Sequence, residues 1–146
     1  MPHVQVQATT RASATDIWKM WIDVEGSPAW DTDVEWSRLD GAFRPGTIGA
    51  FKLKGGPELR FELESVELLR SYSNTVRLPG LRVRFTHEVE SIDSRLNVVR
   101  HGAVLSGPLS WVLAPLLVRK LRAALQLALR NMLTQAELKA HVAAAA

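Results

Sequence analysis

The chain has 146 residues, 47% of them hydrophobic and 23% charged, which is typical of one folded domain covering residues 1–146. A net charge of +3, without a run of Lys and Arg, argues against a nucleic-acid-binding protein. The lack of cysteine excludes disulfides and thiolate chemistry. The first residues do not have the basic and then apolar layout of a signal peptide, so we expect a cytoplasmic protein.

The first quarter of the chain predicts one strand and two short helices. Residues 3–9 alternate apolar and polar side chains, as a half-buried strand does. A helix is predicted to begin at Ser13, because Asp16 follows it at the spacing of a capping box. The apolar face of this helix consists of Ile17, Met20, Trp21 and Val24. Gly26 and Pro28 end it, and Ser27 between them is placed to cap a second short helical turn.

From Val34 to Ser106 the pattern is that of strands separated by turns that contain Gly or Pro. The predicted strands cover residues 34–37, 48–54, 59–68, 72–78, 81–92 and 96–106. The apolar phase changes after Leu63, which indicates a bulge near Ser65. Because these strands follow one another in hairpins, we expect a strongly curved antiparallel sheet of six to seven strands.

The last quarter, residues 108–140, predicts one long helix with a continuous apolar stripe. Apolar side chains recur every three or four residues, at Leu117, Leu121, Ala124, Leu125, Ala128, Met132 and Ala136. Pro115 lacks an amide hydrogen and should start or kink the regular part of this helix. A stripe of this length needs a wide partner surface, so we expect an α+β fold in which the helix lies across the concave face of the sheet.

Three segments, in this order, are similar to one known family. They are ATTRASATDIWKMWIDVEGSPAW, which holds Trp18 and Trp30, then FRPGTIGAFKL, and finally VVRHGAVLSGPLSWVLAPLL, which runs from a strand into the long helix. Together they resemble the helix-grip fold of the START-related superfamily, also called SRPBCC, and within it the polyketide cyclase/dehydrase and lipid-transport-like family. Catalytic residues are not shared across that family, so the resemblance assigns none here.

The resemblance implies a hydrophobic cavity between the sheet and the long helix. The residues that we expect to line it are aromatic or aliphatic side chains and two histidines: Trp30, Trp36, Phe51, Phe61, Phe85, His87, His101, Trp111, Leu117, Leu121 and Leu125. Trp30 and Trp111 stand at the ends of their predicted elements, where the mouth of a cavity would be.

The two histidines are predicted to lie opposite each other. If the turn after Ile92 has three residues, Ile92 pairs with Leu96, and His87 then pairs with His101 on the apolar face of the two strands. One interpretation is a polar pair that orients a ligand or transfers a proton. The other is two buried histidines held by backbone or water, which is the commoner case. Two histidines without a third ligand nearby are a poor metal site, and we expect neither metal nor cofactor.

These observations leave two functions open. The first is binding or transport of a small hydrophobic molecule, such as a lipid or polyketide. The second is a polyketide cyclase, aromatase or dehydratase that uses a cavity histidine as acid or base. A transient membrane contact is expected only if residues 109–118 are exposed. A homodimer also stays open.

Overall fold

The computed structural model describes residues 1–145, as one sheet, two α-helices and a short 3-10 helix. Their bounds are β1 His3–Thr10, α1 Ala14–Ile22, η1 Ser27–Ala29, β2 Val34–Leu39, β3 Ile48–Leu53, β4 Glu58–Glu67, β5 Ser71–Leu78, β6 Leu81–Ser91, β7 Asn97–Ser106 and α2 Ser110–Ala145. The order of elements is the predicted one.

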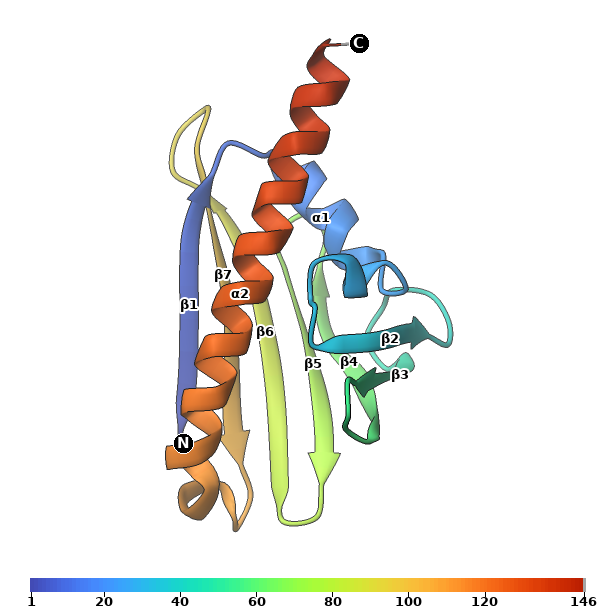
Figure 1. The fold of residues 1–146 in the computed structure, drawn as a ribbon, viewed down its shortest axis with the longest axis vertical. Helices are drawn as coiled ribbons and strands as arrows, with labels where there is room; N and C mark the ends of the chain where they lie inside the picture. Colours follow the sequence, from blue (N-terminus) through green and yellow to red (C-terminus); the bar gives the residue numbers. More distant parts are fainter. Residues whose placement is uncertain (146) are drawn as a thin grey trace.

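The seven strands form one antiparallel sheet in the order β1-β7-β6-β5-β4-β3-β2. Strands β2 to β7 follow one another in hairpins, and β1 closes the far edge by pairing with β7. Figure 1 shows the sheet curving around α2, with β2 and β3 turned away from the plane of β6 and β7. The register shifts between Leu63 and Ser65, so the predicted bulge in β4 is confirmed. The α+β helix-grip fold is thus present.

Helix α1 forms where the capping pattern predicts it. The Ser13 hydroxyl accepts a hydrogen bond from the amide of Asp16 at 3.1 Å, which satisfies one of the free amides of the first turn. Ile17, Trp18, Met20 and Trp21 are buried on one face, and they pack against the sheet and α2. The short helix η1 begins with Ser27 and Pro28, whose fixed φ suits a first helical turn.

Helix α2 begins at Ser110 and therefore includes Pro115, which neither starts nor interrupts it. A proline at this place removes the amide that would bond the carbonyl of Trp111, and its ring crowds that carbonyl. Trp111, Val112 and Leu116 around it are exposed, so water can take over that carbonyl. The expectation that the regular helix starts at Pro115 is therefore wrong by about one and a half turns, and the alternative, a kink at Pro115, stays a prediction.

The two halves of α2 differ in burial. In the second half Leu129, Met132, Leu133 and Ala136 are buried in the main core, together with the tryptophans of α1. Polar side chains fix this half to the loop after α1, since the Asn131 amide donates to the carbonyl of Trp30 at 3.1 Å. The Gln135 amide donates to the carbonyl of Ala29 at 2.7 Å. This half of the helix is covered on the sheet side and by α1 and η1.

In the first half of α2 the apolar stripe is only half-buried. Leu117, Leu121 and Leu125 pack on a smaller core cluster made of Val4, Leu81, Val83, Ala103 and Leu105, yet all three keep part of their surface exposed. The prediction of one continuously buried stripe is therefore wrong here. Spacing along a helix fixes which side chains share a face, and it does not show whether a second element covers that face.

We predict that the two halves of α2 respond differently to truncation. Met132 is 0% exposed, so Met132→Ala should lower the free energy of unfolding by about 3 kcal/mol. Leu121→Ala should cost about 1 kcal/mol, because a half-buried leucine has less apolar surface to lose. Urea unfolding of the two variants beside the parent measures both values, and equal losses would show that α2 is buried uniformly.

A second prediction concerns Thr75, which lies on the outer face of β5 between Glu62 and Arg84. Among the described residues its hydroxyl is the one buried side-chain oxygen or nitrogen without a hydrogen-bond partner. Thr75→Val keeps the shape and removes the unsatisfied group, so it should raise the free energy of unfolding by about 1 kcal/mol.

The same change at Thr10 is the matched control. Its buried hydroxyl donates to the Glu137 carboxylate at 2.7 Å and accepts from the amide of Ala12 at 3.1 Å. Thr10→Val should therefore lower the free energy of unfolding by about 1–3 kcal/mol. Thermal or urea unfolding decides the signs, and a Thr75→Val variant less stable than the parent would contradict this account.

Candidate functional site

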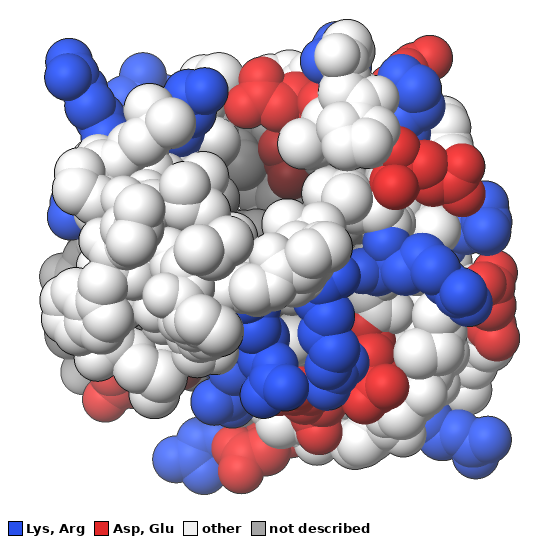
Figure 2. All heavy atoms as spheres, turned by 90° about the horizontal axis from the view of Figure 1, so that it is seen from below, with Lys and Arg blue, Asp and Glu red and all other residues white. Residues whose placement is uncertain are grey.

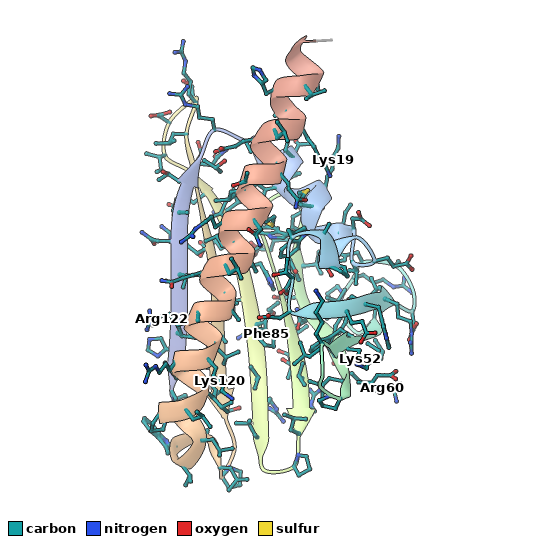
Figure 3. All side chains as sticks on the ribbon, viewed as in Figure 1. Lys19, Lys52, Arg60, Phe85, Lys120 and Arg122 are labelled. Atoms are coloured by element: carbon teal, nitrogen blue, oxygen red, sulfur yellow. The ribbon has the colours of Figure 1, made fainter. Side chains whose placement is uncertain are left out.

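The candidate site is a groove beside the first half of α2. Phe51, Leu59 and Phe85 project from the concave face of β3, β4 and β6, and Leu117 and Leu121 project from α2. All five side chains are half-buried although they lie on the inner side of the fold. Phe85, labelled in Figure 3, lies on β6 next to α2. An apolar inner face that stays partly exposed means that the walls do not close on each other.

Figure 2 views the molecule from the end where α2 begins, and it shows a hollow between a mass without charged side chains at left and the opposite rim. Acidic side chains gather at that rim. The site is thus a groove that opens to solvent, whereas the sequence and the family resemblance predicted an internal cavity. The single helix does not reach the β2–β3 side of the sheet, and this leaves the opening.

Polar side chains occupy the inner part of the groove. Asn74 pairs with Leu63 and Phe85 in the register of β5, so its amide lies on the concave face. Tyr72, two residues before Asn74 on β5, lies on the same face and is buried. Neither side chain forms a hydrogen bond with another residue of 1–145, and neither contributes a fully buried unsatisfied atom, so the hydroxyl of Tyr72 and the amide of Asn74 keep some contact with solvent. Both are therefore free to bond a ligand.

Asp31, in the loop before β2, is the third polar group. Burial raises the pKa of its carboxyl to about 6, and the charge of Asp33 adds to this effect. The pKa of Tyr72 is raised as well, first by burial and then by the charge of Asp31, so the two groups are close enough to interact. A carboxyl with a pKa near neutrality can accept or donate a proton under physiological conditions.

The predicted pairing of His87 with His101 is confirmed. The amide of Ile92 bonds the carbonyl of Leu96 at 2.8 Å, and the resulting register places the two histidines opposite each other. Their rings meet edge to face with centroids 4.9 Å apart. The Tyr72 ring stacks on the His87 ring, with centroids 3.9 Å apart. The two histidines therefore lie next to Tyr72, at the inner, polar end of the groove.

Both histidines are held as neutral groups. The indole N–H of Trp21 donates to Nε2 of His101 at 3.1 Å, which requires that this nitrogen carry no proton. Burial lowers the pKa of His101 to about 4. Burial, and next the neighbouring His101, hold the pKa of His87 well below its usual value, against a weak bond between its Nδ1 and the carbonyl of Tyr72 at 3.4 Å.

Three of the predicted cavity residues lie elsewhere. Trp30 is buried in the main core, 6.3 Å from His101 between ring centroids, and not at a mouth. Trp36 pairs with Lys52 on the outer face, because a bulge between Val34 and Trp36 reverses the alternation of β2. Trp111 is 70% exposed at the start of α2. Of the remaining candidates, Phe61 is buried against Phe51, and Leu125 is half-buried beside Leu121.

The surface has two further hollows besides the groove. One of about 590 Å³ lies between the end of β1 and the last turns of α2, around Thr10 and Glu137. The other, of about 210 Å³, lies on the outer face of the sheet near Ser65 and Arg84. Both are open surface depressions, and the Glu137 carboxylate in the first is already bonded to Thr10. Within residues 1–145 no three His, Cys, Asp or Glu side chains are placed to share a metal ion.

Sequence reasoning did not identify Tyr72, Asn74 or Asp31 as site residues. A signal for Asn74 was available, since it interrupts an apolar face of β5 formed by Tyr72, Val76 and Leu78. Asp31 gave no such signal, because the burial of a loop residue depends on elements that are distant in sequence. Here those elements are β5 and the second half of α2.

We predict that acidification destabilises the fold. Unfolded histidines have a pKa of 6.5, whereas that of His101 is about 4 in the fold and that of His87 is also lowered. Between these values the unfolded chain binds protons that the folded chain does not, so each histidine lowers the free energy of unfolding by up to about 1.4 kcal/mol per pH unit. The loss sets in as the pH falls below 6.5.

Asp31 acts in the opposite direction, since its pKa rises from 3.8 to about 6 and the folded chain binds its proton first. Between pH 6 and pH 4, protonation of Asp31 in the folded chain should offset the loss in free energy of unfolding that one histidine causes. Urea unfolding across this range should show a net loss for the parent, almost none for His87→Phe, and about twice the loss for Asp31→Asn. Parallel curves for all three proteins would show that these groups do not control the acid response.

Comparisons with known proteins agree with this fold. A family described as polyketide cyclase / dehydrase and lipid transport matches residues 1–137. No sequence among curated proteins matches the chain. A solved hypothetical protein of Helicobacter pylori has 16% sequence identity and a TM-score of 0.76, over 92% of this chain and 87% of its own.

Two other solved structures extend the comparison. The protein TTHA0849 of Thermus thermophilus has a TM-score of 0.73 at 16% identity, over 95% of this chain and 99% of its own. Norcoclaurine synthase of Thalictrum flavum, in complex with dopamine and hydroxybenzaldehyde, has a TM-score of 0.71 at 16% identity, over 94% of this chain and 86% of its own. At such identities the likeness concerns the fold. With the family match over nearly its whole length, the chain belongs to the polyketide cyclase/dehydrase and lipid-transport family of the SRPBCC superfamily.

Proposed function

We propose that this protein binds a small, mainly apolar molecule that carries at least one hydrogen-bonding group. The observation behind the proposal is the half-buried apolar lining of the groove, formed by Phe51, Phe85, Leu117 and Leu121, with Tyr72 and Asn74 at its inner end. Ligand sites of this kind have mostly apolar walls and a few polar groups that fix orientation. The proposal includes a cytoplasmic location, which rests on the sequence alone.

Burial of the ligand would complete a core that the fold leaves open. Apolar surface on the groove walls is in contact with water in the free protein, and a bound apolar molecule removes it at roughly 25 cal/mol per Å². Tyr72 and Asn74 would orient the ligand, because their unpaired donors inside the groove favour a ligand with a hydrogen-bond acceptor at the matching place. A carrier of lipids or of polyketide-like molecules fits these requirements and the range of the family.

An enzyme of the cyclase or dehydratase kind is the alternative, and Asp31 is the observation that favours it. Its carboxyl, with a pKa of about 6, is available both as base and as acid near neutral pH. The histidines are less suited to this role, because His101 is buried and accepts a bond from Trp21, and the pKa of the half-buried His87 is held well below its usual value. The norcoclaurine synthase complex shows that this fold can hold two small aromatic molecules.

We predict that the groove binds the dye 1-anilinonaphthalene-8-sulfonate, with a rise in dye fluorescence. Leu121→Trp places a larger side chain in the groove and should weaken binding by about tenfold or more, while the fold is kept. Leu138→Trp, on an exposed part of the same helix, is the matched control and should bind as the parent does. Fluorescence titration with circular dichroism of each variant provides both measurements.

Equal dye affinity in the parent and in Leu121→Trp would place the dye outside the groove and would count against the proposal. To separate carrier from enzyme, Asp31→Asn keeps the size of the side chain and removes its proton chemistry. A carrier should keep its affinity for the dye and for any co-purifying molecule in this variant. An enzyme should lose turnover of a polyketide-type substrate at unchanged binding.

A further inference from the structure

The end of the molecule where α2 begins presents an exposed apolar patch. Trp111 is 70% exposed, Val112 73%, Leu116 57% and Leu109 43%. Leu78, in the neighbouring β5–β6 hairpin, is also exposed, and the amide of Leu109 bonds the carbonyl of Gly80 in that hairpin at 2.9 Å. Figure 2, which views this end, shows a continuous white surface without charged side chains. Large apolar patches of this kind mark interaction sites.

The patch adjoins a group of cations. Arg119, Lys120 and Arg122 follow it on α2, are exposed, and form no salt bridge with another described residue. Arg122 and Lys120 are labelled in Figure 3 on the lower part of α2. From Ser110 to Ala136 the helix contains no acidic residue. This stretch of surface therefore carries positive charge without local neutralisation, unlike the outer face of the sheet, where Arg77 and Arg84 pair with Glu64.

Apolar and basic groups are arranged in layers along α2. The basic trio follows the apolar residues 111–116 by about seven positions, which is about 10 Å along a helix that rises 1.5 Å per residue. Interfacial helices bury their apolar groups about 5–10 Å into the boundary between headgroups and acyl chains. With the apolar turn at that depth, the three cations would stand at the level of the lipid phosphates, and Trp111 would take the interfacial place that tryptophan prefers.

We propose that this end of the protein docks on an anionic lipid bilayer. The charge of the patch favours this occupant over a second copy of the chain, because a two-fold contact would bring two groups of three unpaired cations to one interface, whereas an anionic surface neutralises them. The groove opens at the same end, so docking through its α2 side would set that edge of its mouth against the lipid, with the acidic rim on the opposite side of the opening (Figure 2). In the described residues no helix is long and apolar enough to cross a membrane.

Vesicle flotation tests the proposal. The parent protein should bind vesicles of phosphatidylcholine mixed with phosphatidylglycerol, and much less those of phosphatidylcholine alone. Replacement of the three cations by glutamine should weaken binding about 100-fold, since each cation near an anionic surface contributes about fivefold. Replacement of Val112 and Leu116 by serine should abolish it. Leu138→Ser, which changes a leucine 61% exposed near the other end of α2, should leave binding unchanged.

Tryptophan fluorescence adds a positional readout. The emission of the parent should shift to the blue on anionic vesicles, and Trp111→Phe should lose most of the shift while it still floats with them. Absence of binding to anionic vesicles would overturn the proposal, as would equal binding to neutral vesicles. A dimer in gel filtration that Val112→Ser and Leu116→Ser dissociate, without vesicle binding by the parent, would assign the patch to a second copy. These outcomes are independent of dye binding in the groove.

Discussion

The structure depends on a difference in width between the sheet and the helix that covers it. Seven strands about 4.8 Å apart form a sheet about 30 Å wide, whereas an α-helix with its side chains is about 10 Å across. Curvature of the sheet reduces this difference without removing it. Helix α2 packs mainly on β1 and β7, so the concave face of β3 to β6 needs another cover. The fold provides that cover at one end only.

At the covered end, α1 and η1 close the space between α2 and the sheet. Trp18, Trp21 and Trp30 fill it, and Asn131 and Gln135 fix the loop to α2. The two histidines belong to this end, where the Trp21 indole and the stacked Tyr72 ring keep them in place. At the other end nothing comparable covers the sheet, and Phe51, Phe85 and Leu121 stay half-exposed. Asp31, Tyr72 and Asn74 stand where the two regions meet. One molecule thus combines a rigid core with an open apolar groove.

Much of this arrangement could be predicted from the sequence, because it depends on local pattern. Alternation within β6 and β7, with the length of the turn between them, gave the pairing of His87 with His101. The phase change after Leu63 gave the bulge in β4. Trp36 was assigned to the wrong face because a second bulge, after Val34, lies in a strand too short for the change of phase to be seen. Local pattern specifies a face and a register when the strand is long enough.

Burial by distant elements was not predictable in this way. The spacing of Leu117, Leu121 and Leu125 identifies an apolar face, and their half-burial follows from the absence of an element beyond α2 on that side. Trp30 is buried because the second half of α2 passes over its loop, more than a hundred residues later in the chain. Asp31 is buried for the same reason. The sequence pattern therefore gave no sign of Asp31, whose carboxyl pKa of about 6 suits proton transfer near neutral pH.

We propose the groove beside the first half of α2 as the ligand site. Methyl NMR of the leucines, with an apolar probe added in steps, tests this proposal most directly. The methyl resonances of Leu117, Leu121 and Leu125 should shift together and saturate at one probe concentration, while those of the buried Leu129 and Leu133 stay in place. Shifts confined to Leu138 and other exposed leucines, with the groove leucines unchanged, would contradict it.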